Sequence, residues 1–464
     1  MQNENGDTTV KQKNQTTMLL GIVLSVLTYW LFAQSIVNVV PDIQKGLNID
    51  ASVVSLAVSL TSLFSGMFVV LAGYLADRVG RVKATYAGLF FSLLGSLLIS
   101  ISTGAVLLIV GRIVQGLSAA LIMPATLAII KSQFKGDQRK TALSYWSMGS
   151  WGGSGICAFA GGAIATFLSW RWIFIFGIIF TLVAMLLLRG TPESKIESGT
   201  NVHFDFIGLI FFLVAILSIN IFLSKGAAWG WGSLMTLSLL LIAAVVGAFF
   251  YIAEKRNKTN PFIDFKIFKN RRFTIATISN FALNAVAGSL VIINTFMQKN
   301  FSMSPLQSGS LSIPYFVTIL ISIRVGEKLI NKRGYALPMI CGGLVAGVGT
   351  MLSGFTFLSM NAYLISAFLG YALLGVGLGL YATPSTDMAV SNVPDNQVGT
   401  ASGIYKMASS LGGGIGNAAS LAIFVSMSAS GLVVSALWSI MFSAVLCLIP
   451  AILVFVGLGV RKSN

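Results

Sequence analysis

The chain has 464 residues, of which 55% are hydrophobic and only 9% are charged, against about 25% charged residues in an average soluble protein. A membrane-spanning helix needs about 20 apolar residues, so the sequence has room for about fourteen such helices and for little else. This composition excludes an ordinary soluble enzyme. It predicts an all-α polytopic membrane protein.

Apolar runs bounded by charged residues, or by Pro, Gly and Asn, predict fourteen transmembrane helices. The first run, residues 18–41, is longer than the apolar stretch of a signal peptide and has no cleavage site, so we expect it to remain as a span. The other predicted spans are residues 53–76, 84–103, 105–130, 141–168, 170–189, 206–224, 233–253, 273–297, 305–323, 336–357, 361–387, 400–426 and 433–459.

The basic residues are concentrated on one side of this predicted topology. The net charge is +16, and 24 of the 30 Lys and Arg residues fall in the two tails and in every second connection between spans. Two more, Arg112 and Lys406, lie within spans. Because basic loops are retained in the cytoplasm, both termini are predicted to be cytoplasmic. The positive charge therefore reflects membrane topology, and no nucleic-acid partner is expected.

The longest predicted cytoplasmic loop, residues 255–272, interleaves apolar residues with Lys and Arg. Its apolar members are Ile263, Phe265, Ile267 and Phe268. We interpret this loop as a segment that lies on the anionic inner leaflet of the membrane lipid. A solvated linker is the alternative.

Neither a metal nor an organic cofactor is predicted. Cys157, Cys341 and Cys447 each lie inside a long apolar run, without CxxC spacing or a neighbouring His, so we expect them to pack between helices. His203 is the only histidine and lies in a predicted cytoplasmic connector. We do not expect it to carry protons across the membrane.

Two stretches of the sequence resemble each other, residues 116–153 and residues 375–413. In each, a Gly-rich span with a late Pro is followed by a polar loop, so that Pro124 corresponds to Pro384 and Thr141 to Thr400. Paired halves around a central site are typical of alternating-access transporters, whereas a channel has no need of such a repeat. The repeat predicts cytoplasmic tails at 1–17 and 460–464, six-helix bundles at 18–189 and 273–459, and between them a two-helix insert with cytoplasmic connectors at 190–272.

Three motifs carry a family resemblance. The string GYLADRVGRVK, residues 73–83, places Asp77 among basic residues and between glycines that allow a close approach and a tight turn, so an ion pair there can latch the two halves together. GRIVQG, residues 111–116, places Arg112 in an apolar span, and the fifth span is rich in Gly. These motifs resemble those of the major facilitator superfamily. The resemblance implies a conformational latch at Gly73, Asp77, Arg78, Gly80 and Arg81.

Longer strings, among them WLFAQSIVNVVP, PFIDFKIFKN and SGIYKMASSLGG, resemble the fourteen-span drug:proton antiporter family, and within it the Nor-type quinolone and multidrug efflux pumps of Gram-positive bacteria. The resemblance implies a monomeric pump of the plasma membrane, driven by the proton gradient, that exports hydrophobic drugs such as quinolones, dyes and quaternary ammonium compounds. A narrow-specificity exporter of tetracycline or of an endogenous metabolite is the alternative. An enzyme is not supported, because the predicted spans hold no cluster of His, Asp and Glu.

The proton carrier is not evident, because the first span reads FAQ at residues 32–34 where the family has an acidic residue. We name three candidates for proton coupling. Arg112 must face the interior, where it couples protons or holds neighbouring helices through their carbonyl groups. Asp42 and Asp387 lie at span ends, where a carboxyl can be exposed in one state and desolvated in another. Lys406 is expected to extend its amine to the cytoplasmic interface, and a functional role within its span is the alternative.

A pocket for flat hydrophobic drugs consists mainly of aromatic and amide groups with little fixed charge. The predicted spans supply such groups, although any one of them can instead pack between helices or lie at the membrane interface. The candidates for the substrate cavity are Trp30, Phe32, Gln34, Asn38, Gln115, Tyr145, Trp146, Trp151, Asn280, Asn284 and Tyr381.

Overall fold

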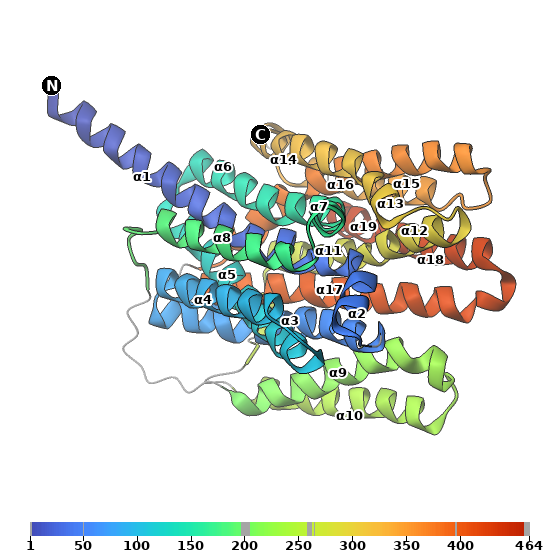
Figure 1. Cartoon of the computed structure of the whole chain (residues 1–464). Coiled ribbons are helices and arrows are strands. Elements are labelled where there is room, and N and C mark those ends of the chain that lie inside the picture. The colour runs from blue at the N-terminus through green and yellow to red at the C-terminus, as the bar shows by residue number, and fades with distance from the viewer. Residues whose placement is uncertain are drawn as a thin grey trace.

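The computed structural model describes residues 2–49, 51–195, 205–257, 262–263, 265–394 and 397–458. Within these ranges the regular secondary structure is helical throughout, with no strand. Figure 1 shows long helices that run side by side in one bundle, with α9 and α10 along one edge. The expected all-α architecture is confirmed for the described part of the chain. His203 lies outside the described residues.

The first half of the chain forms eight α-helices, two of which are joined to the next by a π-helical turn. Such turns insert an extra residue into a helix and shift the direction in which the following side chains point. The elements are α1 (Gln2–Leu27), η1 (Thr28–Ala33, π-helical), η2 (Gln34–Asn38), α2 (Val40–Leu47), α3 (Ala51–Val79), α4 (Arg81–Ser100), α5 (Ala105–Gln133), α6 (Gly136–Ser147), η3 (Met148–Gly152, π-helical), α7 (Gly153–Phe167) and α8 (Arg171–Leu187).

The rest of the chain forms a helical pair and then a second set of long helices. The pair consists of α9 (Phe206–Trp229) and α10 (Leu234–Arg256), which pack against each other. The helix α9 also packs against α17. The remaining elements are η4 (Phe265–Lys269), α11 (Arg271–Ala285), α12 (Ala287–Asn300), α13 (Pro305–Ser310), α14 (Ile313–Arg333), α15 (Ala336–Ser353), α16 (Met360–Ser391), α17 (Val398–Ser426), η6 (Ser428–Ser430), α18 (Leu432–Leu446) and α19 (Leu448–Leu458).

Twelve helical segments of the described chain are long and apolar enough to cross a membrane, or thirteen if one sharply bent pair is a single span. That pair consists of Phe159–Phe167 and Arg171–Leu187, which meet at 116°. It falls on the spans predicted at 141–168 and 170–189. The first of these is rich in Gly and Ser and is interrupted by η3, and the second coincides with α8, which is apolar but has only 17 residues.

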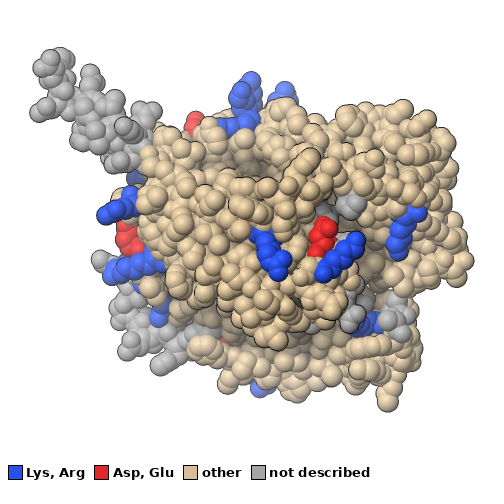
Figure 2. Space-filling model, in the orientation of Figure 1, with Lys and Arg blue, Asp and Glu red and all other residues tan. Residues whose placement is uncertain are grey.

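The helices pack in two similar groups. In the first half α5 packs against both α3 and α4, and in the second half α16 packs against both α14 and α15. These groups correspond to the second, third and fourth helices of each predicted bundle. The face shown in Figure 2 is mostly uncharged, as a lipid-facing surface must be, with Lys and Arg side chains at its left end and upper edge and a few in its middle and at its right.

The loop predicted to lie on the membrane surface packs inside the protein. Phe262 and Ile263 are each 3% exposed, and the Phe262 ring lies 5.5 Å from that of Phe212 on α9. The Glu254 carboxylate of α10 accepts a hydrogen bond of 3.1 Å from the backbone N–H of Ile263, which holds the segment against the helix. The interpretation as a lipid-facing segment is therefore wrong for Ile263 and Ile267, which are buried within the protein, whereas Phe265 and Phe268 are half-buried.

Candidate functional site

Asp77 joins the two halves of the molecule at one end of the bundle. Its carboxylate lies 2.9 Å from the Arg81 guanidinium, and both side chains are buried. Its other oxygen accepts a hydrogen bond of 2.8 Å from the backbone N–H of Gly399, next to the start of α17. A carboxylate at a helix N-terminus is stabilised by the unpaired N–H groups and the helix dipole. Arg78 instead stacks on the Tyr74 ring, at 4.7 Å.

Two glycines allow this approach. A Cβ on Gly73 would lie 2.3 Å from the carbonyl oxygen of Gly399, so only glycine lets α3 and α17 come this close. Gly80 has a φ of 124°, which side chains other than hydrogen rarely permit, and it makes the turn between α3 and α4. The latch residues named from the sequence thus lie together, at what we call the latch end, formed by the connections at 79–81, 133–136 and 333–336 and by residues 391–394 and 397–398.

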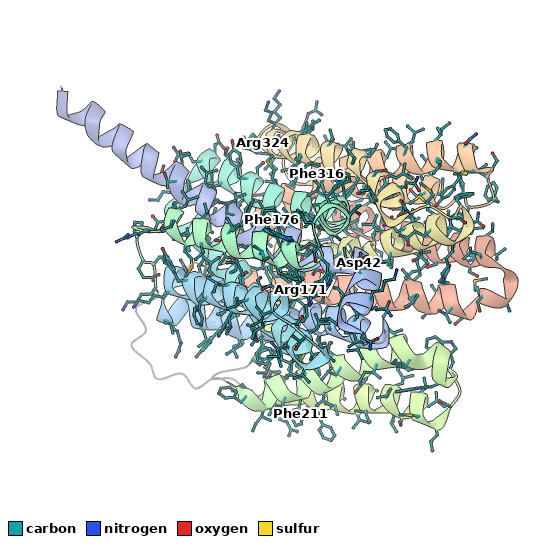
Figure 3. All side chains as sticks on the ribbon, in the orientation of Figure 1. Asp42, Arg171, Phe176, Phe211, Phe316 and Arg324 are labelled. Atoms are coloured by element: carbon teal, nitrogen blue, oxygen red, sulfur yellow. The ribbon has the colours of Figure 1, made fainter. Side chains whose placement is uncertain are left out.

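Further contacts between the halves close the latch end. The Lys131 amine donates a hydrogen bond of 2.7 Å to the Val393 carbonyl. The Thr141 hydroxyl donates to the Glu327 carboxylate. The Arg324 guanidinium, labelled in Figure 3, lies 3.8 Å from the centre of the Tyr145 ring. Together with Asp77 and Gly399, these contacts leave the latch end closed.

A cavity of about 330 Å³ lies between the halves. This volume is at the lower end of the range of small-molecule sites. Four of the predicted cavity residues line it: Trp30, Gln34, Trp151 and Asn284. Other lining residues, which the sequence did not single out for the cavity, are Tyr29, Ser62, Ser150, Ser154, Asn294, Gln298, Tyr315, Tyr371, Lys406, Ser409 and Asn417.

The other predicted cavity residues lie elsewhere. Phe32 packs against Phe180, at 4.9 Å between ring centres. Trp146 is fully buried and donates to the Thr126 hydroxyl, and Asn280 donates to the carbonyl of Tyr405. Gln115, Tyr145 and Tyr381 do not line the cavity either, and the side chain of Asn38 lies outside the described residues.

Arg112 ties helices together. It is fully buried, and one amino group donates to the Ala33 carbonyl at 2.6 Å and to the Gln115 side chain at 2.8 Å, while Nε donates to the Ala57 carbonyl at 3.4 Å. Gln115 in turn donates to the Ser96 hydroxyl of α4. Within the described chain, no carboxylate forms an ion pair with Arg112. The geometry is that of a cation held by backbone carbonyls of η1 and α3.

The two candidate acids differ in exposure, because Asp387 is buried and Asp42 is exposed. Asp387 is fully buried near the latch end, accepts a hydrogen bond of 2.9 Å from the Tyr335 hydroxyl, and lies 3.8 Å from the Arg139 guanidinium of the other half. Burial, with the Asp387 charge beside it, raises the pKa of the Tyr335 phenol, so this group remains a donor at neutral pH. Asp42 is exposed in the first turn of α2 (Figure 3).

Lys406 does not reach the membrane interface as expected. Its side chain is 4% exposed and lines the cavity, with the amine 4.6 Å from the centre of the Trp146 ring. The expectation of an interfacial amine is therefore wrong. A signal for this position is present in the sequence, because Lys406, Ser409, Gly413 and Asn417 recur at the three- to four-residue spacing of one helix face, and all four line the cavity.

Comparisons with known proteins identify the family to which this chain belongs. The family model described as Major Facilitator Superfamily matches residues 18–417. The "Quinolone resistance protein NorB" of Staphylococcus aureus strain MRSA252 is 55% identical over 411 residues, which are 89% of this chain and 89% of that protein. The NorB protein of strain MW2 matches with the same identity and coverage.

Solved structures with low sequence identity share the fold. The crystal structure of the human organic anion transporter MFSD10 (TETRAN) has a TM-score of 0.69 at 15% identity, covering 96% of this chain and 99% of that one. The peptide transporter POT in complex with sulfate has a TM-score of 0.64 at 18% identity, covering 97% of this chain and 96% of that one.

Proposed function

Because this chain belongs to the Major Facilitator Superfamily, we propose that it exports drugs across the plasma membrane in exchange for protons. It is a multi-pass membrane transporter and not an enzyme. The 55% identity to a quinolone resistance protein supports quinolones as substrates. Dyes and quaternary ammonium compounds complete the proposed range, and the pump acts as a monomer, driven by the proton gradient without a cofactor.

The proposed topology has fourteen spans, arranged as six, two and six, with both termini in the cytoplasm. It treats the bent pair as separate spans: α6, η3 and α7 as the fifth and α8 as the sixth. The basic residues of the latch end, among them Lys131, Arg139 and Arg324, support a cytoplasmic position for that end. The structure would then be closed on the cytoplasmic side.

The observation that carries this proposal is the position of the cavity. Residues from both halves line it, from Trp30 and Trp151 on one side to Asn284 and Lys406 on the other. A site shared between two halves that are latched at one end is accessible from one side of the membrane at a time when the halves rock. In this scheme the Asp77 latch holds the cytoplasmic side shut while the drug leaves outward.

Proton coupling acts through groups outside the cavity. No Asp or Glu of the described chain lines the cavity, so drug and proton do not compete there for one carboxylate. Of the candidates Arg112, Asp42 and Asp387, the last is best placed, because protonation would remove its attraction to Arg139 across the two halves. Protons entering from outside would thus loosen the latch end and let the emptied pump reset. Each charge moved across 100 mV supplies about 2.3 kcal/mol.

The test uses purified protein in proteoliposomes with an interior pH dye and an imposed pH gradient. Norfloxacin, ethidium and tetracycline are added in turn. Proton movement with several of these unrelated compounds is the expected result, and it is lost in Asp77→Asn but kept in Lys299→Ala, which changes an exposed lysine. A response to one compound alone would indicate the narrow exporter, and transport that ignores the pH gradient would exclude antiport.

A further inference from the structure

Lys406 places a basic amine in the wall of the cavity. The residue lies on α17, its side chain is 4% exposed, and its amine lies 4.6 Å from the ring centre of Trp146 and 5.9 Å from those of Trp30 and Tyr405. Attraction between an ammonium and the faces of aromatic rings stabilises the charge in part. Aromatic rings provide no counter-charge, however.

This ammonium has no carboxylate partner in the described chain. None of the ion pairs there includes Lys406. None of the residues that line the cavity is acidic, and Lys406 is the one basic residue among them. Charging a buried amine without an ion-pair partner is costly, so an anion that enters the cavity would stabilise the charged form of Lys406.

The rest of the wall suits a flat aromatic molecule. Tyr29, Trp30 and Trp151 come from the first half, and Tyr315 and Tyr371 from the second. Amide groups of Gln34, Asn284 and Asn417 add neutral donors and acceptors. The cavity therefore offers ring surfaces and amides for a planar body, with one basic amine that can carry a positive charge.

We propose that Lys406 binds a carboxylate of the substrate, so that the cavity prefers planar aromatic acids and zwitterions over permanent cations of similar size. This inference rests on the proposed export of drugs and adds a substrate class to it. The ammonium donates charge-assisted hydrogen bonds to the carboxylate, while the rings of Trp30 and Trp146 lie beside the amine and attract its charged form. A quaternary ammonium compound is repelled by this charge and gains no such bond, so we expect it to bind more weakly than an acid with the same ring system.

The test measures binding of one drug in two forms. Norfloxacin and its methyl ester share the ring system and the basic amine but differ in the carboxylate. Their dissociation constants are measured by calorimetry on the purified protein in nanodiscs, at a pH at which the carboxyl is ionised and without any proton gradient. We expect wild type to bind the acid at least about tenfold more tightly than the ester, in line with a hydrogen bond to a charged group.

Variants of Lys406 test whether this residue causes the preference for the acid over the ester. Lys406→Met should abolish the preference for the acid while leaving the affinity for the ester within about twofold, and Lys406→Arg should keep the preference because it keeps the charge. Lys299→Met changes an exposed lysine and should behave as wild type. A preference that survives in Lys406→Met would overturn the inference.

The wild-type protein alone can also overturn it. If the acid and the ester bind equally well to wild type, no carboxylate site exists, whether or not the variants fold. Failure of the proposed function gives a different result, namely no drug-driven proton movement in proteoliposomes. If the protein moves protons with ethidium but does not distinguish the acid from the ester, the proposed function stands and this inference is wrong.

Discussion

The Glu327 carboxylate of α14 accepts a hydrogen bond from the Thr141 hydroxyl of α6, as the Asp77 carboxylate of α3 accepts one from the backbone N–H of Gly399 in the first turn of α17. Thr141 corresponds in the internal repeat to Thr400, the neighbour of Gly399. Each carboxylate also forms an ion pair with an arginine three or four residues away in the sequence, at 2.7 Å for Arg324–Glu327 and 2.9 Å for Arg81–Asp77. Two related contacts, one from each half, therefore close the latch end.

The paired latches predict additive effects. Asp77→Asn and Glu327→Gln each replace a charged acceptor by a neutral one, and each is expected to weaken the closed latch end by about 1–2 kcal/mol. The double variant should open it further than either single variant. Spin labels at two exposed positions, Val79 and Lys332, would report this as a longer distance population in pulsed electron resonance.

A matched control is available for the latch variants. Asp137→Asn removes a carboxylate that is 80% exposed and pairs with Lys140 at the surface, so it should leave the label distances unchanged. Equal opening in Asp137→Asn and Asp77→Asn would show that net charge, and not the two contacts, governs the latch end.

The close approach of α3 and α17 gives a second prediction. In Gly73→Ala the new methyl group would meet the Gly399 carbonyl at 2.3 Å, so the helices must separate and the latch end should open without any change of charge. In Gly162→Ala the methyl group meets nothing within 4 Å, and a helical Gly→Ala change there is expected to be neutral or stabilising by up to about 1 kcal/mol. Melting temperature and ethidium efflux of the two variants should differ accordingly. Normal efflux in Gly73→Ala would contradict the observed packing.

Two substitutions of Arg112 distinguish a structural role of this residue from a role in proton coupling. Arg112→Ala leaves the carbonyls of Ala33 and Ala57 and the Gln115 side chain without their donor, and we expect it to lower stability by about 3 kcal/mol. Arg112→Lys keeps the charge but cannot bridge three acceptors in the same way. If Arg112→Lys melts like wild type and yet moves no protons, Arg112 takes part in coupling. A lowered melting temperature with normal coupling in the surviving protein would confirm the structural role.

Most of the spans were predictable from the sequence because long apolar runs are interrupted by basic connections, and twelve helical segments of the described chain are long and apolar enough to cross a membrane. The direction of individual side chains was harder to predict. Trp146 and Trp151 lie on the same predicted span, but five residues apart, which places them about 140° apart around a regular α-helix. Trp151, which lies in η3, lines the cavity, while Trp146 packs against Thr126. The apolar pattern alone does not show which face of this span lines the cavity. Lys406 was misplaced for a related reason, since a lysine near a span end suggests the interface unless its neighbours on the helix face are considered.

The last prediction concerns the proton carrier. In Asp387→Asn the attraction to Arg139 across the two halves is lost, while an acceptor for the Tyr335 hydroxyl remains. We therefore expect a pump that still exchanges labelled for unlabelled norfloxacin across the membrane but no longer accumulates the drug in response to a pH gradient. Asp42→Asn changes an exposed carboxylate of α2 and should retain both activities. An intact response to the pH gradient in Asp387→Asn would exclude this carboxyl as the proton carrier, and loss of the response in Asp42→Asn would transfer the role to the other end of the molecule.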